Sequence, residues 1–508
     1  DSGTSQYNSS RISYGSSWSA PMVSGGVALM AQAFPNHTPE QLVDRILASA
    51  NNVWFTPEGN TTFTTHGNSV NHGYHSTWGH GVPDFYAALS PITSDGNPAS
   101  MSLYTGNSIE SSEAVSLGTS YITPSASFGN AISQGLIGEV GYAYDALNGG
   151  FKYDISKRIN MTSKKAPAIN LSSELSKLDT QLLSNEKPFW KKNFSNVVST
   201  LSETDELEAS ITFGASSFPI QSFFESNSDS EANLSDFQAP YLEMGEGGVG
   251  LNANYEFGNK RLMLGATTPI LINNLTGEKI GSRKSLVASL EYQIPSKTSL
   301  TLMTGFTQDK DNLLGATGND AYSMSGSKSN TTFAAFKVQN KLGNDLTLTG
   351  MAEVAKTNMS KPSNSFINSA DNVKSSSLNV IATKKNITGE DSLSLSVNQP
   401  SRVDKGEMSI RLSNLAESDG RINYKNKNIN LKPNGRQMVY CLSYRKDLDN
   451  DIGFSFKQLL TSNLNHINDS EIFRSSYLGL KYKDFKLGYN VNSQDLSKNT
   501  EFSFNRMF

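Results

Sequence analysis

Cysteine is almost absent from this sequence, and charge is sparse. Cys441 is the single cysteine among 508 residues, so the sequence holds no pair for an internal disulfide or for a cysteine-rich metal site. Charged residues make up 18% and the formal net charge is -4, which indicates neither a nucleic-acid-binding surface nor a strongly acidic one. The 40 glycines, together with many serines and asparagines, instead indicate a polar, β-rich protein of more than one domain.

Long hydrophobic runs are also missing. No stretch approaches the roughly 20 consecutive apolar residues that a membrane-spanning helix needs. This does not exclude a membrane, because β-barrels cross the bilayer with short alternating strands. The sequence also starts without a methionine or a secretory signal, so we expect it to be the C-terminal part of a longer protein.

A serine at a predicted helix start is the strongest candidate for chemistry. The segment reads Gly15-Ser16-Ser17-Trp18-Ser19-Ala20-Pro21-Met22-Val23-Ser24-Gly25, and an uncharged run continues to Phe34. This pattern predicts a turn at Gly15 and then a helix that begins near Ser17 and is buried on all sides. The Ser17 hydroxyl would lie where free N–H groups and the helix dipole stabilise the negative charge that develops in acyl transfer.

Two further segments predict helices later in the chain. Thr38 is a candidate N-cap, followed by Pro39 and by Gln41 at the third helical position. An amphipathic run follows, with apolar residues Leu42, Val43, Ile46 and Leu47. In the segment Trp78-Gly79-His80-Gly81-Val82-Pro83-Asp84, the aspartate is expected to cap a short last helix.

Together these segments resemble the subtilisin-like serine proteases. Ser17 takes the nucleophile position of the family pattern, with Ser16 in place of the usual threonine and with Ser19, Pro21 and Gly25 in register. A literal Gly3-Thr4-Ser5 also occurs, but it lacks the proline and the apolar helix, so we do not assign Ser5. Trp18 and Met22 depart from the family's usual residues, which alters packing and leaves the hydroxyl in place.

The resemblance implies peptide-bond hydrolysis through an acyl-enzyme, with Ser17 as the catalytic residue. We assign no cofactor and no metal-binding residue, and calcium sites are not predicted either way. In this family the aspartate, the histidine base and the oxyanion asparagine all precede the serine. We therefore expect these partners upstream of Asp1, and no activity from this chain alone. A protein or peptide is the expected substrate, and its preference is not predicted, since the cleft strands that set it would also lie upstream.

All six histidines follow Ser17, which is the wrong order for its base. Four lie between residues 61 and 80, namely His66, His72, His75 and His80. The spacing of His72 and His75 invites comparison with a zinc site, but no cysteine, aspartate or glutamate lies among the four. We interpret this segment as an exposed polar loop or hairpin.

From about residue 243 to the chain end, apolar and polar residues alternate in segments of about 10 residues. The apolar positions include Val249, Leu251, Ala253, Tyr255, Phe257, Leu286, Ala288, Leu290, Tyr292, Ile294, Leu346, Leu348, Ala352, Val354, Leu393, Leu395, Val397, Phe485, Leu487, Tyr489 and Val491. Val287 and Met351 interrupt the polar face. Short links such as Gly258-Asn259 occur beside long polar ones, which is typical of an antiparallel transmembrane β-barrel, here of about twelve strands.

A soluble β-sandwich or solenoid would alternate in the same way. The chain end favours the barrel, because Phe502, Phe504 and the terminal Phe508 share one face of a last strand, which resembles the final strand of outer-membrane barrels. The segment from Ser396 to Val403, with Gly406, is also similar to a barrel segment of autotransporters.

The residues between these two parts fit neither of them. The segment 141–156 resembles a small β element that follows the catalytic domain in protease autotransporters. The stretches 172–184 and 188–201 are expected to be helical, one of them threading the barrel, with a solvated linker as the alternative. The predicted domains are 1–92 for the C-terminal part of the peptidase domain, 93–238 for a linker region with a pore helix, and 239–508 for the barrel.

As a whole, the sequence resembles a subtilisin-like autotransporter. This implies a multidomain fold with the C-terminal portion of an α/β subtilisin-like protease domain, a mixed linker region and a C-terminal transmembrane β-barrel. It also implies a bacterial outer-membrane location with the protease part at the cell surface or released, and outer-membrane lipid and the barrel-assembly machinery as partners, with no nucleic acid. Two alternatives stay open: an inactive passenger with an adhesion or binding role, and an outer-membrane pore.

Overall fold

The computed structural model divides into two compact units. It describes residues 15–161 and 248–504, except 269, 273–278, 296, 344, 450–451, 470, 484 and 494–497, and also residues 169, 171, 174–175, 178, 197–203, 207–214 and 245–246. The first unit comprises Asp1–Ser120, Gly138–Ile155 and Arg411–Asn426, and the second comprises Tyr121–Ile137, Ser156–Ile410 and Lys427–Phe508. Both units are therefore built from chain segments that are distant in sequence. The boundaries predicted at residues 92 and 238 stay predictions.

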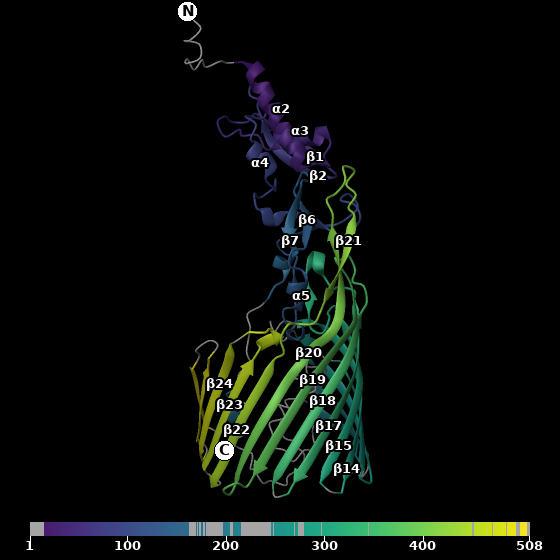
Figure 1. Cartoon of the computed structure of the whole chain (residues 1–508), viewed down its shortest axis with the longest axis vertical. Helices are drawn as coiled ribbons and strands as arrows, with labels where there is room; N and C mark the ends of the chain where they lie inside the picture. The colour runs from purple at the N-terminus through teal and green to yellow at the C-terminus, as the bar shows by residue number, and fades with distance from the viewer. Residues whose placement is uncertain are drawn as a thin grey trace, which may run out of the picture. The chain divides into compact units, whose positions relative to one another are not determined.

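Three helices of the first unit pack around a small apolar core (Figure 1). They are α2 (Ser16–Ala33), α3 (Pro39–Ala48) and α4 (Phe85–Leu89). The core consists of Met30, Phe34, Leu42, Ile46 and Ala88. The predicted caps are confirmed: the Thr38 hydroxyl accepts from the Gln41 N–H at 3.2 Å in a capping box, and Asp84 accepts from the Ala87 N–H at 2.9 Å.

The strands of the first unit form a hairpin and a small sheet. The hairpin joins β1 (Gly59–Thr65) to β2 (Asn68–Tyr74), which confirms the hairpin interpretation of the histidine-rich segment. The small sheet has the order β4-β3-β6-β7, formed by β3 (Ser102–Tyr104), β4 (Ala114–Ser116), β6 (Val140–Tyr144) and β7 (Gly150–Asp154), with the 3-10 turn η1 (Pro98–Ser100) before β3. The β element predicted for residues 141–156 is thus confirmed.

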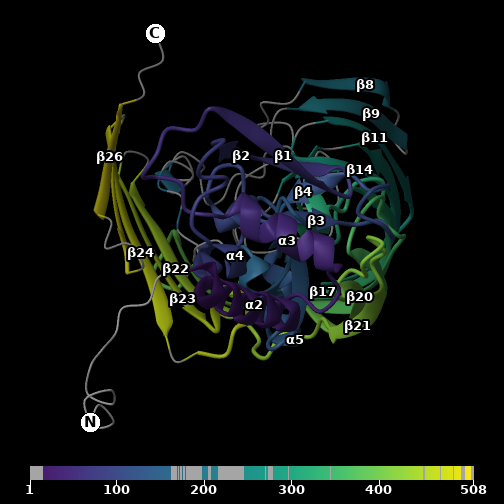
Figure 2. The ribbon, with the colours of Figure 1, turned by 90° about the horizontal axis from the view of Figure 1, so that it is seen from above.

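A long antiparallel ladder dominates the second unit. Its strands pair successively from β8 to β26 and are β8 (Val197–Glu203), β9 (Leu207–Gly214), β11 (Gly248–Phe257), β12 (Lys260–Thr267), β14 (Lys279–Ile294), β15 (Thr298–Lys310), β17 (Lys328–Leu342), β18 (Leu346–Met359), β19 (Ile367–Lys385), β20 (Asp391–Ser413), β22 (Met438–Asp449), β23 (Ile452–Ser462), β24 (Ile472–Tyr482), β25 (Phe485–Asn492) and β26 (Lys498–Phe504). The sheet curls strongly when it is viewed along its strands (Figure 2). Its short accessory strands are β10 (Gly245–Glu246), β13 (Ile270–Ile272) and β21 (Tyr424–Asn430).

The remaining elements of the second unit are short. They are β5 (Ile122–Thr123), η2 (Ala126–Phe128), α5 (Ala131–Gly135), β16 (Thr317–Gly318), η6 (Asp320–Tyr322) and η7 (Leu464–His466), and η3 (Ile155–Arg158) begins at the boundary with the first unit. No helix within the described residues has both the length and the apolar character to cross a membrane.

The predicted alternation of side chains is confirmed in this sheet. Leu286 and Leu290 of β14 are exposed, whereas the residues directly before them, Ser285 and Ser289, are buried. Val287 and Met351, the predicted interruptions of the polar face, are buried among the polar residues. The strands are longer than the predicted segments of about 10 residues, since β19 has 19 residues and β20 has 23. Each of these strands continues into polar stretches that resemble loops in the sequence, because it pairs there with an equally long neighbour.

Residues near position 170 pack on the buried face of this sheet. Ile169 and Leu171 join an apolar cluster with Val439, Cys441, Leu459 and Tyr477. Glu174 pairs with Lys457 of β23 at 3.3 Å, and both side chains are almost fully buried. Glu174 and Leu175 are helical, as predicted for 172–184, whereas Leu178 lies in a turn. The helix predicted for 188–201 is wrong at its end, because Val197 and Val198 lie in β8, where β-branched residues are favoured.

Candidate functional site

Ser17 lies in the first turn of α2, as predicted. Gly15 precedes the helix with a φ of 150°, and the Trp18 N–H donates to the Gly15 carbonyl at 3.1 Å. The Ser17 side chain is exposed to solvent. The free N–H groups of the first turn and the positive end of the helix dipole therefore lie close to its hydroxyl. The alternative Ser5 lies outside the described residues.

The prediction that α2 is buried on all sides is wrong. Of its 18 residues only Gly26 and Met30 are buried. Trp18, Met22 and Leu29 are 65%, 75% and 58% exposed. A helix without a charged residue gains its stability from burial, yet most of its apolar surface here has no partner among the described residues.

No histidine is paired with Ser17 in the part of the chain that the structure describes. His66 Nδ1 lies 3.0 Å from a carboxylate oxygen of Glu110, and its Nε2 lies 3.1 Å from the Ser418 carbonyl oxygen, so both ring nitrogens are engaged. His75 Nε2 lies 3.4 Å from Glu58. Neither His66 nor His75 contacts Ser17 in the described residues, and the prediction that none of the six histidines is its base stays a prediction.

His72 of the β1–β2 hairpin and His80 lie close together, but their ring nitrogens are not bonded to each other within the described structure. The rings of His72 and His80 have centroids 5.7 Å apart, and His72 Nε2 lies 3.0 Å from the His80 carbonyl oxygen. Burial lowers the pKa of His80, and the nearby His72 lowers it further. Within the described ranges, no group of three histidine, cysteine, aspartate or glutamate side chains is arranged to hold a metal ion.

A buried ion pair that the sequence analysis missed supports the helices beside Ser17. Arg45 of α3 and Asp145 lie 2.6 Å apart, and neither side chain is exposed. Arg45 also donates to the carbonyl oxygens of Ala88 and Ser90 at 2.6 and 2.8 Å, and its guanidinium lies 4.2 Å from the centre of the Phe34 ring. The only sign of this pair in the sequence was Arg45 itself, a charged residue among the apolar residues of α3. Its partner Asp145 could not be identified, because it lies 100 residues away in the sequence.

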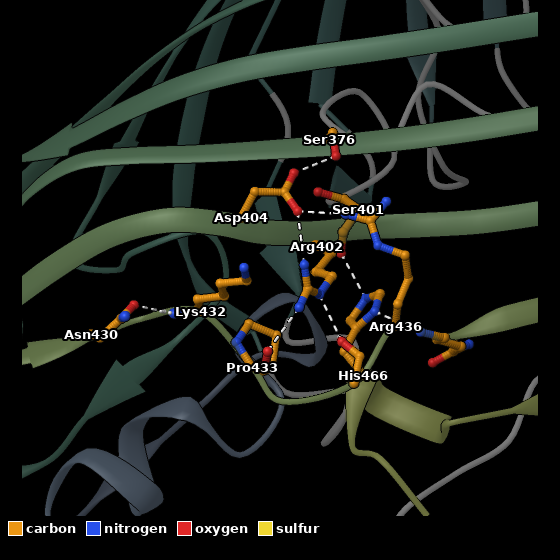
Figure 3. Close-up of polar contacts among 11 residues, drawn as sticks. Ser376, Ser401, Arg402, Asp404, Asn430, Lys432, Pro433, Arg436 and His466 are labelled. Atoms are coloured by element: carbon orange, nitrogen blue, oxygen red, sulfur yellow. Dashed lines mark hydrogen bonds and ion pairs between the residues drawn. The ribbon is translucent and has the colours of Figure 1, made fainter.

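A second polar cluster lies in the second unit, around Arg402 (Figure 3). Arg402 donates to the carbonyl oxygens of Gly435 and Pro433 and to Asp404, at 2.7 to 2.8 Å. Asp404 also accepts from Arg436 at 2.5 Å and from the Ser376 hydroxyl. All these groups satisfy one another, so the cluster connects β20 to the loops after β21 and β23.

His466 belongs to the same cluster and is fully buried. Its Nδ1 accepts from the Gln437 N–H at 2.9 Å, and its Nε2 lies 3.0 Å from the Ser401 carbonyl oxygen, to which it donates. Burial lowers the pKa of His466 from 6.5 to about 4, and Arg402 and Arg436 act in the same direction. The imidazole is therefore neutral at pH 7, and with both nitrogens engaged it is a structural residue.

Comparison with known proteins gives a family match for the N-terminal part of the chain and only distant structural matches over the larger part of the chain. The family model of the subtilases matches residues 1–81. Solved structures that match include the toluene transporter TodX of Pseudomonas putida, with 9% identity over 58% of this chain and 81% of that one and a TM-score of 0.26. The ferric yersiniabactin uptake receptor FyuA of Yersinia pestis matches with 11% identity over 61% of this chain and 59% of its own, again with a TM-score of 0.26.

At these TM-scores the structural likenesses carry no argument, and no curated protein matches the chain. The family match over residues 1–81 includes Ser17 and the β1–β2 hairpin. The N-terminal part of this chain is therefore subtilase-like, which confirms the resemblance drawn from the segment around Ser17.

Proposed function

We propose that Ser17 is the nucleophile of a serine endopeptidase that an outer-membrane barrel displays on a bacterial cell. The subtilase match includes Ser17, and its exposed hydroxyl lies at the N-terminus of α2. In the proposed reaction the Ser17 oxygen attacks the scissile carbonyl and loses its proton to a histidine. The histidine gives this proton to the amine of the substrate as the C–N bond breaks, and water then hydrolyses the acyl-enzyme that remains. N–H groups at the start of α2 stabilise the oxyanion.

The histidine and aspartate of this reaction are proposed to come from polypeptide outside the printed sequence. The exposed apolar surface of α2 supports this part of the proposal. Trp18, Met22 and Leu29 would be covered by further chain of the same domain, and that chain would bring the base to Ser17. The described residues alone are expected to be inactive.

Substitution of Ser17 in the full-length gene product tests the catalytic assignment. Ser17→Ala is expected to abolish peptide hydrolysis and labelling by a serine-directed fluorophosphonate probe, while the sheet of the second unit still assembles. Ser5→Ala, at the alternative Gly-Thr-Ser sequence, is the matched control and should retain both. Labelling of the Ser17→Ala variant at the wild-type level would refute the assignment.

The membrane part of the proposal is supported by rows of exposed apolar side chains. Leu290, Leu302 and Phe336 lie opposite one another on three adjacent strands, β14, β15 and β17, and all three are exposed. Leu480 and Leu487 form a similar exposed pair on β24 and β25. Such rows on one face, with serine and threonine on the other, are the pattern of a barrel with a lipid-facing outside and a polar lumen.

An open pore is the competing function, and the residues near position 170 argue against it. Leu171 lies where a side chain on Gly488 would stand, with its Cδ1 2.8 Å from the position of such a Cβ. Together with the buried Glu174–Lys457 pair, this contact supports a segment that occupies the interior of the sheet. Conductance in planar bilayers distinguishes the functions. Removal of residues 162–184, which leaves β8 and β9 in place, should raise conductance if the segment blocks a channel. It should leave conductance unchanged if the full chain is already open.

A further inference from the structure

One connection of the large sheet belongs to the first unit. The chain runs along β20 in the second unit up to Ile410, contributes Arg411–Asn426 to the first unit, and returns to the second unit within β21. We name residues Arg411–Asn426 the docking loop. Ordinary hairpin connections are short and lie beside their own strands, so a connection of this length that belongs to another compact unit requires specific contacts.

The backbone of the docking loop pairs with a segment of the N-terminal region. The Ile109 N–H donates to the Gly420 carbonyl at 2.9 Å, and the Ile422 N–H donates to the Asn107 carbonyl at 2.8 Å. These two bonds flank an antiparallel bridge between Ser108 and Arg421. The loop is therefore paired in a fixed register, because both bonds depend on the same alignment.

Side chains add hydrogen bonds on both sides of this bridge. The Tyr424 hydroxyl lies 2.6 and 2.7 Å from the carbonyl oxygens of Tyr104 and Gly106. The Tyr144 hydroxyl donates to the Asn414 carbonyl at 3.0 Å, and Arg411 donates to the Thr105 carbonyl at 2.7 Å. These groups are partly or fully buried, so each bond satisfies a polar atom that would otherwise lose its contact with water.

An apolar core lies beneath these bonds. Ile422 and Ala416 of the docking loop are buried together with Tyr104, Ile109 and Tyr144, with exposed fractions of 1% to 7%. The loop also reaches the subtilase-like residues, because Asn36 donates to the Ala416 carbonyl at 2.8 Å. A buried core and a satisfied polar rim are the composition of a stable protein–protein interface.

The exchange is reciprocal. Residues Tyr121–Ile137 of the N-terminal region belong to the second unit. Thr123 pairs with Thr317 between β5 and β16, and the Asn434 N–H donates to the Asn130 side chain at 3.3 Å. The four large apolar side chains of this segment that are almost completely buried are Ile122, Phe128, Ile132 and Leu136.

We propose that these two exchanged segments keep the two units associated without a covalent bond between them. A chain cut after Ile155 would leave the docking loop inside the first unit and Tyr121–Ile137 inside the second. The N-terminal fragment would then stay bound to the C-terminal fragment and would not be released, whatever makes the cut. This proposal does not depend on catalysis by Ser17 or on the membrane in which the sheet lies. Its failure would therefore leave the proposed function untouched, and the reverse also holds.

Controlled cleavage of the full chain tests the proposal. The recognition sequence of a site-specific protease is inserted after Met161, which is 43% exposed, in a background that carries Ser17→Ala. After complete cleavage in detergent, the N-terminal and C-terminal fragments should co-elute in size-exclusion chromatography and separate only in denaturant. Separation of the two fragments in native buffer would overturn the proposal.

Variants of each exchanged segment sharpen the test. Ile422→Asp in the docking loop and Leu136→Asp in the reciprocal segment are each expected to reduce co-elution, and the double variant should lose it. Asp419→Ala is the matched control, since Asp419 is exposed within the same loop and its carboxylate pairs with Arg421 two residues later. Each variant is first compared uncleaved by tryptophan fluorescence. If folded double-variant fragments still co-elute, other contacts hold the units together and the proposal is wrong.

Discussion

Arg45 and Asp145 carry opposite charges that are both completely removed from water. Because removal of one partner leaves the other charge buried and unpaired, Arg45→Met is expected to destabilise the first unit by about 3–5 kcal/mol. Three of the four tryptophans, Trp18, Trp54 and Trp78, lie in this unit, so tryptophan fluorescence in a urea titration reports on it.

Arg421→Met is the control for this substitution. Arg421 pairs with Glu417 and Asp419 in the same unit, but its side chain is 67% exposed. Solvent screens exposed pairs, so this variant should unfold near the wild-type urea concentration. Equal shifts for the two arginine variants would show that burial of the Arg45 pair is not what makes it important.

His466 predicts a loss of stability of the second unit in acid. Its folded pKa of about 4 lies below the ordinary histidine pKa of 6.5, so protonation favours the unfolded chain. The stabilising contribution is complete above pH 6.5 and is lost as the pH falls toward 4, with a maximum of about 3 kcal/mol from the difference of the two values. Thermal unfolding followed by far-UV circular dichroism at pH 7 and pH 4.5 measures this loss.

Replacement of the imidazole isolates the part of this pH dependence that belongs to His466. His466→Gln removes the titrating group and should reduce the pH dependence of the melting temperature relative to wild type. An identical pH dependence in the two proteins would assign the acid sensitivity to other groups.

At the residue scale, the sequence predicts features that depend on near neighbours. Ser17, Thr38 and Asp84 were identified because a cap or a helix start is encoded within three or four residues. The Arg45–Asp145 pair and the His466 cluster were not predicted, because their partners meet only when distant segments fold together.

At the scale of elements, Gly406 marks a close approach between β20 and its neighbour β19. Its φ of +152° lies in a region that favours glycine, and a Cβ at this position would lie 2.7 Å from the Cα of Val373. The register between β19 and β20 also shifts near this site, around Lys374. Gly406→Ala should therefore lower the stability of the sheet by about 1–3 kcal/mol.

Gly350→Ala provides the comparison, because Gly350 lies in β18 and a Cβ there would meet no atom within 4 Å. Both variants are compared by thermal unfolding in the same detergent. A similar melting temperature for Gly406→Ala and wild type would mean that the close approach of β19 and β20 relaxes at little cost.

The alternation of exposed apolar and buried polar side chains was predictable, because successive residues of a strand point to opposite faces and the sequence shows the same period of two. Strand length was not, since β19 and β20 continue into polar stretches that only pairing with a neighbour makes regular. The exposure of α2 was predicted wrongly for a related reason: an apolar helix shows that a partner is needed, but it does not show whether the described chain supplies that partner.

At the scale of the whole molecule, the exchanged segments change what the domain order means. The sequence alone predicts a peptidase part, a linker and a barrel that follow one another along the chain. In the structure, each compact unit contains a segment from the other end of the chain. No local pattern encodes this exchange, because the docking loop and its partners Tyr104 and Ile109 are about 300 residues apart, as the 320-residue separation of the Tyr424–Tyr104 bond illustrates.

The membrane assignment makes a prediction for the whole second unit. Leu302 is 57% exposed and lies between Leu290 and Phe336 in the middle of the apolar row. If lipid covers this row, Leu302→Arg must bring a charge into hydrocarbon, and it should destabilise the reconstituted protein by about 2–4 kcal/mol. Urea unfolding in lipid vesicles, followed by circular dichroism, measures the effect.

Leu448 is the matched position, because it is 62% exposed and lies one residue before the end of β22. A charge near a strand end can reach the headgroup region, so Leu448→Arg should cost about 1 kcal/mol or less. The difference between the two variants depends on depth in a bilayer, and a soluble sheet has no reason to distinguish them. If both variants are equally stable in vesicles, or if the wild-type protein stays dissolved without detergent, water and not lipid surrounds this sheet.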